Sequence, residues 1–351
     1  MKRIIHQILS ALLAGCILPV FFYYGAAALL LRDPSGAVRS FYYALKQGVS
    51  ASLPLASPAP EESAVPAPEQ PGDLVPIWDS GAQTLLQVPL REYLIGAVAS
   101  EMPVSWPDAA LQAQAVAAHS YLLYCRDHAD PAQLHGGWRS ADPARRQGFI
   151  PDAGLRSYWG TQYAAHWSRL SALVDEVLDT LLTYEGQPAC ACYFAISSGR
   201  TEASQNVWQQ ALPYLQGVDS SWDKQAEGFR QTITMDSTQM HSALVTGLNI
   251  HTDGWLPDAY FSGYQYTDAG YVASLSVCGT PVTGPALREA LDLRSSCFSI
   301  TWDGQTFLID TLGYGHGVGL SQTGAMQMAQ NGSSWQEILV HYFPGTTLSS
   351  L

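Results

Sequence analysis

The chain has 351 residues, which is enough for one large domain or two smaller ones with a sizeable hydrophobic core. Its 17 Lys and Arg residues are outnumbered by 30 Asp and Glu residues, for a formal net charge of −13. Such a charge repels nucleic acids and anionic membrane surfaces, and no basic run offers an exception, so nucleic-acid-binding functions are excluded.

An uncharged apolar run from Ile8 to Leu31 follows the basic pair Lys2 and Arg3. Its 24 residues suffice to cross a hydrocarbon layer, which needs about 20. Because the basic pair precedes the run, the positive-inside rule keeps the N-terminus in the cytoplasm and places the rest of the chain outside. We therefore predict a single-pass protein of the cell membrane with its globular part extracytoplasmic.

Two other interpretations of this segment are a cleaved signal peptide and a lipoprotein. A cleaved signal peptide is disfavoured because the run is too long and no small-residue cleavage site follows it. The tetrapeptide LAGC, which ends at Cys16, resembles a lipoprotein processing site. Fifteen further apolar residues after Cys16 argue against lipidation, which stays the main alternative to an uncleaved span.

A spacer is predicted between this span and the globular part. Residues 32–50 suit a short helix, and residues 51–73 are rich in Pro, Ala, Ser and Glu. Such a segment has too little apolar surface to pack and reads as an extended linker. The predicted organisation is a cytoplasmic tip and transmembrane anchor at 1–31, an extracytoplasmic Pro/Ala-rich spacer at 32–75, and a globular domain at 76–351.

The globular part is expected to be α+β: a single elongated domain with mixed helices and β-hairpins around a substrate groove. In chain order we expect a hairpin at 76–88, helices at 89–102 and 106–126, an irregular stretch to about 154 and a helix at 163–180. A hairpin over 180–199 should turn at Gly186–Pro188, and short strands and a helix should fill 229–295. A second hairpin at 297–312 should turn at Asp303–Gly304, before a glycine-rich loop with two short helices.

Glu101 interrupts an apolar pattern. In PLREYLIGAVASEMP, residues 89–103, apolar side chains recur at helical spacing from Leu90, and Glu101, four residues after Ala97, falls on the same face. Pro103 disfavours helical geometry at the preceding residue and ends the helix there. Partial burial and the negative end of the helix dipole both disfavour a charged carboxylate, which suits a general acid. The alternative is a glutamate exposed by fraying or paired with a nearby arginine.

The next helix carries no charged residue between Asp108 and Arg126, which predicts a central, largely buried helix. His119 lies within it, four residues after Ala115. By default such a residue is a core histidine whose hydrogen bonds are satisfied.

A glycine-rich loop precedes the penultimate helix. In GYGHGVGLSQTGAMQMAQNG, residues 313–332, glycine stands at every second position from 313 to 319, so an extended chain would present one bare backbone face that a ligand could approach. Ser321 is a plausible N-cap of the following helix and Gly332 a plausible stop. The spacing of a nucleotide-binding loop fails, so sugar or peptide contact is favoured over phosphate contact.

The segment YFAISSGRTEASQNVW, residues 193–208, is the third group of polar residues, with the alternative that it is only a polar loop. The sequence also has 10 Trp and 18 Tyr residues, whose flat apolar faces would suit pyranose rings, although most of them must belong to the core.

Cysteines and histidines give a weak signal for a metal. Outside the apolar run the sequence has five cysteines at scattered positions: Cys125, Cys190, Cys192, Cys278 and Cys297. They do not suggest a disulfide framework, and no CxxC pair suggests a zinc site. Cys190 and Cys192 share a strand face that His128 or His135 could join, but we predict no metal and no cofactor. Cys278 and Cys297, at the ends of two predicted strands, could form a disulfide if those strands are neighbours.

Six segments of the chain carry a family resemblance: VPLREYLIGAVASEMP, AALQAQAVAAHSYLLY, SSGRTEASQNVW, PYLQGVDSSWD, LRSSCF and GHGVGLSQTGAMQMAQNG. Together they resemble the stage II sporulation protein D family, whose domain also occurs in amidase-enhancer proteins of the cell wall. The resemblance covers roughly residues 76–348 in the family's order. It implies that 76–351 is a catalytic domain of a membrane-anchored peptidoglycan lytic transglycosylase, which cleaves glycan strands between N-acetylmuramic acid and N-acetylglucosamine during engulfment at the sporulation septum.

The resemblance also implies partners and site residues. Partners would be peptidoglycan glycan strands, a sporulation cell-wall amidase and other engulfment membrane proteins. The catalytic acid would be Glu101, with Glu202 a weak second carboxylate. The expected substrate-binding residues are His119, Ser198, Gly199, Thr201, Gly315, His316, Gly317, Ser321 and Gln322. We expect His316, Ser321 and Gln322 to line one groove with Glu101, opposite Ser198 and Thr201.

The sequence departs from the family pattern in two places. His119 stands where the family usually has arginine, which puts substrate anchoring at that position in doubt. Some clostridial members have a Cys/His zinc site after the second helix, where residues 136–160 of this chain contain no cysteine. The alternative function is a non-catalytic glycan-binding enhancer of a cell-wall amidase.

Overall fold

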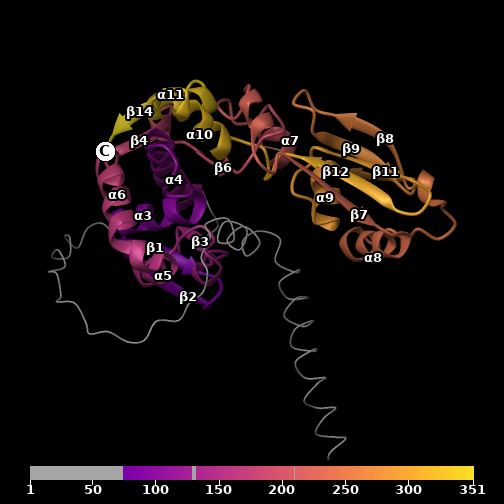
Figure 1. The fold of residues 1–351 in the computed structure, drawn as a ribbon, viewed down its shortest axis with the longest axis horizontal. Helices are drawn as coiled ribbons and strands as arrows, with labels where there is room; N and C mark the ends of the chain where they lie inside the picture. Colours follow the sequence, from indigo (N-terminus) through magenta and orange to yellow (C-terminus); the bar gives the residue numbers. More distant parts are fainter. Residues whose placement is uncertain (1–73, 129–131, 209) are drawn as a thin grey trace, which may run out of the picture. The chain divides into compact units, whose positions relative to one another are not determined.

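The computed structural model describes residues 74–128, 132–208 and 210–351, which belong to one compact unit (Figure 1). The predicted transmembrane span, the lipidation motif at Cys16 and the spacer to residue 73 lie outside the described residues. Within the described ranges, no helix is long and apolar enough to cross a membrane.

Helices and strands alternate irregularly along the chain, and the predicted α+β class is confirmed. The helices are α3 (Leu90–Glu101), α4 (Asp108–His128), α5 (Asp152–Trp159), α6 (Tyr163–Asp175), α7 (Gln205–Trp208), α8 (Ser237–Leu248), α9 (Gly284–Ala290), α10 (Gln322–Gln330) and α11 (Trp335–Tyr342). The strands are β1 (Leu74–Asp79), β2 (Thr84–Pro89), β3 (Arg139–Ala141), β4 (Thr180–Tyr184), β5 (Gln187–Pro188), β6 (Tyr193–Phe194), β7 (Arg230–Met235), β8 (Phe261–Tyr266), β9 (Val272–Val277), β10 (Thr280–Thr283), β11 (Phe298–Trp302), β12 (Phe307–Leu312), β13 (Leu320–Ser321) and β14 (Thr347–Ser350).

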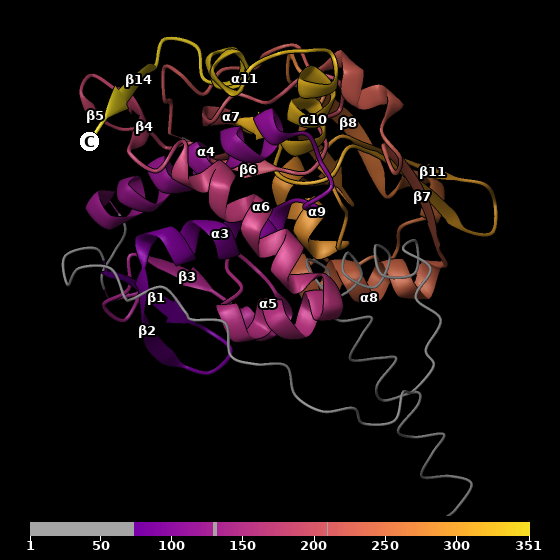
Figure 2. The same cartoon turned by 60° about the vertical axis from the view of Figure 1, so that its left-hand side comes forward.

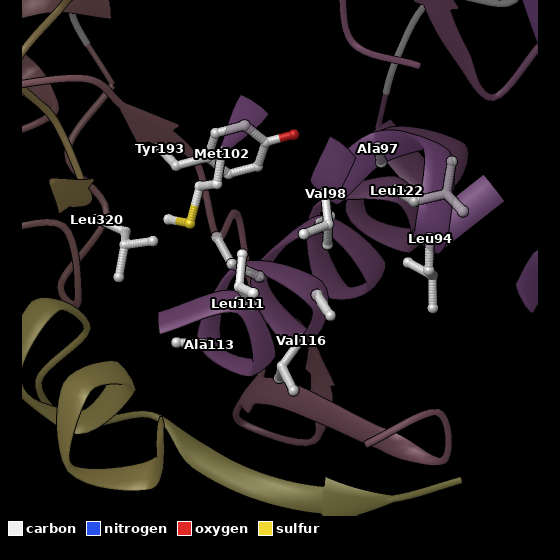
Figure 3. Close-up of a cluster of buried hydrophobic side chains, with 14 of the residues drawn as sticks. Leu94, Ala97, Val98, Met102, Leu111, Ala113, Val116, Leu122, Tyr193 and Leu320 are labelled. Atoms are coloured by element: carbon white, nitrogen blue, oxygen red, sulfur yellow. The ribbon is translucent and has the colours of Figure 1, made fainter. Parts of the chain in front are cut away.

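Helix α4 is the centre of the first hydrophobic core, as its lack of charge predicted. It contacts α3, α6, α10, α11 and β4, and Figures 1 and 2 show these elements around it. Figure 3 shows the apolar side chains that fill the space between α3 and α4, among them Leu94, Val98, Leu111, Val116 and Leu122, with Met102, Tyr193 and Leu320 beside them. The end of α3, and with it Glu101, is held by this packing.

A second hydrophobic core is built from residues between Met240 and Ile309. Its strands form the sheets β11–β12–β7 and β10–β9–β8, and α8 packs against α9 and β7. We refer to residues 230–312 as the insert. The sequence predicted the β11–β12 hairpin correctly, and it predicted one helix in this region where the structure has α8 and α9.

The predicted hairpin over 180–199 is wrong in its second arm. β5 pairs with β4 for two residues only, and β6 pairs in parallel with β13 instead. The reason is local: the amide of Ala191 donates to the carbonyl of Ala189, and that of Cys192 to Cys190, so two successive γ-turns bend the chain away from β4. The other edge of β4 is taken by β14, which was not predicted.

Two smaller expectations were also wrong. Helix α5 forms inside the stretch expected to be irregular, where Leu155 is buried and Arg156 pairs with Asp152 one turn earlier. The helix expected at 163–180 ends at Asp175.

The disulfide between Cys278 and Cys297 is not formed, and every cysteine within the described residues is free. Cys278 directly follows β9, whereas the thiol of Cys297 donates to the carbonyl of Gly270, just before β9 begins. At about 3.3 Å per residue, a strand of this length keeps the two cysteines roughly 20 Å apart. A disulfide requires Cα atoms within about 7 Å, so the prediction was wrong because the two residues lie at opposite ends of one strand.

Candidate active site

Glu101 is the last residue of α3 and is half-buried. The helix ends because Met102 is extended ahead of Pro103, while its amide still donates to the carbonyl of Val98. The carboxylate therefore projects from a helix C-terminus that is packed into the first core. This is the position that the apolar pattern predicted.

The predicted partner Gln322 reaches Glu101. Its Nε2 donates to Glu101 Oε2 over 3.1 Å and lies 3.5 Å from Oε1 of Gln114 on α4. Both glutamines are buried, and the Nε2 of Gln114 has no hydrogen-bond partner among the described residues. Three elements, α3, α4 and α10, thus bring one carboxyl and two amides together.

Ser321 has a different role from the predicted one. Its hydroxyl caps α10 by accepting from the amide of Gly324, and it donates to Oδ2 of Asp223 over 2.7 Å. Ser321 is fully buried, so it positions Gln322 from behind rather than lining a groove.

Asp223 is a buried carboxylate that supports the site and that the sequence interpretation missed. The same Oδ2 also accepts from the amide of Ser197 and the hydroxyl of Ser220, so one buried carboxylate joins the SSG segment, the 220 loop and the start of α10. Burial raises the pKa of Asp223, against the opposing effect of its hydrogen bonds. Its place in the DSSWD segment, the last residue of a family-like motif, was the signal available.

The alternate glycines do not offer a bare face to a ligand, which corrects the prediction for Gly315 and Gly317. All four have positive φ, so the loop is not extended. A Cβ on Gly315 would lie 2.7 Å from Cβ of Phe194, and one on Gly317 would lie 2.8 Å from the Tyr271 hydroxyl. The glycines let the protein's own chain approach, and that contact fills the space.

His316 is hydrogen-bonded to the backbone of Tyr193 in β6. Its Nδ1 accepts from the amide of Val318, so its Nε2 donates to the carbonyl of Tyr193 over 3.1 Å. Burial and the charge of Arg288 lower the pKa of His316 to about 4, which keeps the ring neutral. Its ring also lies 5.2 Å from that of Trp208.

The SSG segment is held by internal hydrogen bonds. The amide of Ser198 donates to the hydroxyl of Tyr271 in the insert, and Gly199 donates to the hydroxyl of Ser197. Thr201 is fully buried and exchanges hydrogen bonds with the backbone at 216 and 218. These contacts stabilise the loop, and the structure brings neither Ser198 nor Thr201 to the carboxyl of Glu101.

Glu202, the second candidate carboxylate, is buried, and both of its oxygens accept hydrogen bonds from the protein. Its Oε1 accepts from the amide of Ala203 and from Asn206, and its Oε2 accepts from Thr267 in the insert. This arrangement is that of a structural carboxylate.

His119 lies in the first core, away from Glu101. It is 1% exposed, and its Nδ1 has no hydrogen-bond partner among the described residues, so the expectation of satisfied hydrogen bonds was wrong for that atom. Burial lowers the pKa of His119 to about 4. A side chain so placed cannot touch a polymer outside, which corrects its inclusion among the substrate-binding residues.

Aromatic residues form a cavity of about 400 Å³ next to this site. Its lining includes Tyr121, Tyr124 and Trp208, and the indole of Trp208 is 43% exposed. The ring of Tyr121 contacts that of Tyr193 edge-on at 6.4 Å. Through Tyr193, the cavity lining is packed against the first core, in which α3 ends.

Arg139, at the start of β3, lies against the same tyrosines. Its guanidinium is 4.7 Å from the ring centre of Tyr121 and 5.6 Å from that of Tyr193, and Nη1 donates to the Tyr193 hydroxyl over 3.1 Å. Among the described residues, no group of three or more His, Cys, Asp or Glu side chains is arranged to hold a metal ion.

Comparisons with known proteins place these features in a family. A family model described as "Stage II sporulation protein" matches residues 79–184, which include α3, Glu101 and α4. The chain is 33% identical over 275 residues to stage II sporulation protein D of Bacillus subtilis strain 168, covering 78% of both proteins. It is 34% identical over 275 residues to stage II sporulation protein D of Bacillus amyloliquefaciens, again covering 78% of each chain. It is 27% identical to the amidase enhancer of B. subtilis, over 73% of this chain and 40% of that protein.

Proposed function

This chain belongs to the stage II sporulation protein D family, and from that premise we propose that it is a membrane-anchored lytic transglycosylase of sporulation. The substrate would be peptidoglycan, cleaved between N-acetylmuramic acid and N-acetylglucosamine. The observation that carries the proposal is one half-buried carboxyl, Glu101, which stands at a helix end and accepts a hydrogen bond from the buried amide of Gln322.

A single carboxylate suffices for this reaction. Glycoside hydrolases ordinarily need two, one as acid and one as base or nucleophile. The other candidate, Glu202, is occupied by three internal hydrogen bonds, which favours a one-carboxylate mechanism.

In the proposed mechanism Glu101 first acts as acid. It transfers its proton to the glycosidic oxygen as the bond from that oxygen to C1 of the muramic acid breaks. The C6 hydroxyl of the same sugar then attacks C1, and the carboxylate takes the proton that this hydroxyl loses. No water is consumed, the two fragments together keep all atoms of the strand, and one fragment ends in a 1,6-anhydro sugar.

The neighbouring amides fit this role. Gln322 fixes Oε2 of Glu101, while Oε1 accepts no hydrogen bond from the described residues and can face the glycosidic oxygen. Gln114, which is fully buried, lies behind Gln322 and holds its amide toward Glu101. Trp208, half-exposed at the cavity, supplies a flat face on which a pyranose ring can stack.

Glu101→Gln tests the proposal because glutamine keeps the shape but has no proton of suitable acidity. We expect turnover to fall at least about 10²-fold, while glycan binding persists. The assay digests peptidoglycan with wild type and variant and weighs the muropeptides, which should carry anhydro ends in the wild type. Glu92→Gln, an exposed glutamate on the same helix, is the matched control.

The same experiment separates the second candidate function. The similarity to an amidase enhancer favours a non-catalytic protein that binds glycan and stimulates a cell-wall amidase. Such a protein would release no anhydro ends and would stimulate an amidase equally well with Glu101→Gln. Reducing ends in place of anhydro ends would make the protein a hydrolase.

A further inference from the structure

Arg139 is a largely enclosed cation that is not paired with a carboxylate. Several arginines of the described structure do form ion pairs, for example Arg91 with Asp175 and Arg169 with Asp108. Arg139 forms no ion pair with any described Asp or Glu, and its contacts are the Tyr193 hydroxyl and two tyrosine rings. Enclosing a guanidinium without a carboxylate is costly, so such a site favours an incoming anion.

Tyr93 lies close to the same cation. Its side chain is 0% exposed, and its hydroxyl makes no hydrogen bond of good geometry within the described residues, although the Arg139 guanidinium is near enough to interact with it. Burial raises the pKa of Tyr93, the charge of Arg139 lowers it, and the charge of Glu101 raises it. The hydroxyl therefore lies in the fields of both groups.

Tyr193 connects the cation to the candidate acid in the same way. Burial raises the pKa of Tyr193, while Arg139 and Glu101 act on it with opposite signs. Arg139 and Glu101 thus act on the same two buried tyrosine hydroxyls. The guanidinium also lies over the ring of Tyr121, which lines the aromatic cavity.

We propose that Arg139 binds a carboxylate of the glycan strand and so sets which sugar is presented to Glu101. This inference rests on the proposed substrate, in which muramic acid differs from N-acetylglucosamine by a lactyl ether. The carboxylate comes either from a free lactyl group or from an attached stem peptide. In both cases the planar guanidinium donates two parallel hydrogen bonds to the carboxylate.

The test measures binding, so that it does not depend on catalysis. Full-length protein with Glu101→Gln is titrated with three strands: strands with free lactyl carboxylates, the same strands with those groups converted to neutral methylamides, and strands that keep their stem peptides. Arg139→Met removes the charge and keeps the length, and Arg139→Lys keeps the charge without the fork. Arg126→Gln is the control, since Arg126 also lies over an aromatic ring but is paired with Asp127.

We expect Arg139→Met to weaken binding of a carboxylate-bearing strand by about tenfold or more, Arg139→Lys to weaken it less, and Arg126→Gln to leave it unchanged. Binding of the neutralised strands should not respond to any of the three. The strand that responds identifies the lactyl group or the stem peptide as the source. If Arg139→Met does not fold, Arg139→Lys and the wild-type comparison of charged and neutralised strands decide.

Equal affinity of the wild type for charged and neutralised strands would overturn the inference. So would an equal loss on both kinds of strand in a folded Arg139 variant, which would make the residue structural. Carboxylate-dependent binding without any release of anhydro ends by the wild type would instead leave this inference standing and remove the proposed transglycosylase.

Discussion

Glu101 and Glu202 were the two candidates for acid chemistry, and hydrogen bonding separates them. Glu101 accepts one hydrogen bond from a neutral amide and keeps one oxygen available. Glu202 accepts three hydrogen bonds from the backbone and from Asn206 and Thr267, so both of its oxygens are committed. Residue type alone could not distinguish a carboxyl that can react from one that holds a loop.

His119 and His316 are both neutral groups of the interior, and this makes the fold acid-sensitive. Burial lowers the pKa of each to about 4, below the value of about 6.5 in an unfolded chain. A depressed pKa means that the stabilisation is present above pH 6.5 and is lost as the pH falls toward 4.

We therefore expect wild-type unfolding free energy to fall between pH 7 and pH 5, with about 2 kcal/mol of the loss due to His316. Urea unfolding of wild type and His316→Gln at both pH values measures that share as the difference between the two slopes. His341→Gln, a more exposed position on α11, is the control and should keep the wild-type slope. An unchanged pH dependence in His316→Gln would contradict a buried neutral ring.

At the scale of elements, the glycine loop is built around the chain that follows β5. The carbonyl of Cys192 accepts from the amide of Leu320, and Gly319 lies directly beside it. The γ-turns at 189–192 and the positive φ of the glycines together allow these two backbone segments to lie in close contact. This contact carries Ser321 to Asp223 and Gln322 to Glu101.

Comparing Gly319→Ala with Gly304→Ala separates the cost of a steric clash with a neighbouring segment from the cost of a positive φ. Both glycines have positive φ, but a Cβ at 319 would lie 2.3 Å from the Cys192 carbonyl oxygen, and at 304 it would meet nothing within 4 Å. We expect Gly304→Ala to cost about 1 kcal/mol and Gly319→Ala at least about 2 kcal/mol more, together with loss of activity. Urea midpoints at unchanged m-value would measure this, and equal losses would refute the packing argument.

At the scale of the whole molecule, the prediction concerns how the chain is held at the membrane. We propose that residues 8–31 stay attached as a single span and that the chain from residue 32 faces the wall, since Lys2 and Arg3 precede the uncharged run. Mass spectrometry of protein extracted from membranes should find the chain intact. Cys16→Ser should change neither its mass, beyond the substitution, nor its membrane retention. A mature N-terminus at a lipidated Cys16 would refute the span.

Local pattern was enough to predict several elements of this protein. The uncharged stretch after Asp108 predicted the central helix, Asp303–Gly304 predicted a hairpin, and the apolar stripe ending at Glu101 and Pro103 predicted where the carboxyl stands. Each of these signals depends on residues close together in the chain, where periodicity and turn chemistry act directly.

What only the tertiary structure decided depends on residues far apart in sequence. Contacts between segments separated by tens to hundreds of residues decide that β6 pairs with β13 and that Asp223 is buried beneath α10. The same kind of contact leaves no room for a side chain at the glycines of the loop. The position of Arg139 against Tyr193 is of the same kind. A sequence pattern can indicate where a polar group lies along the chain. Packing decides whether that group is hydrogen-bonded within the protein or can bind a ligand, because desolvation and hydrogen-bond satisfaction are properties of the packed chain.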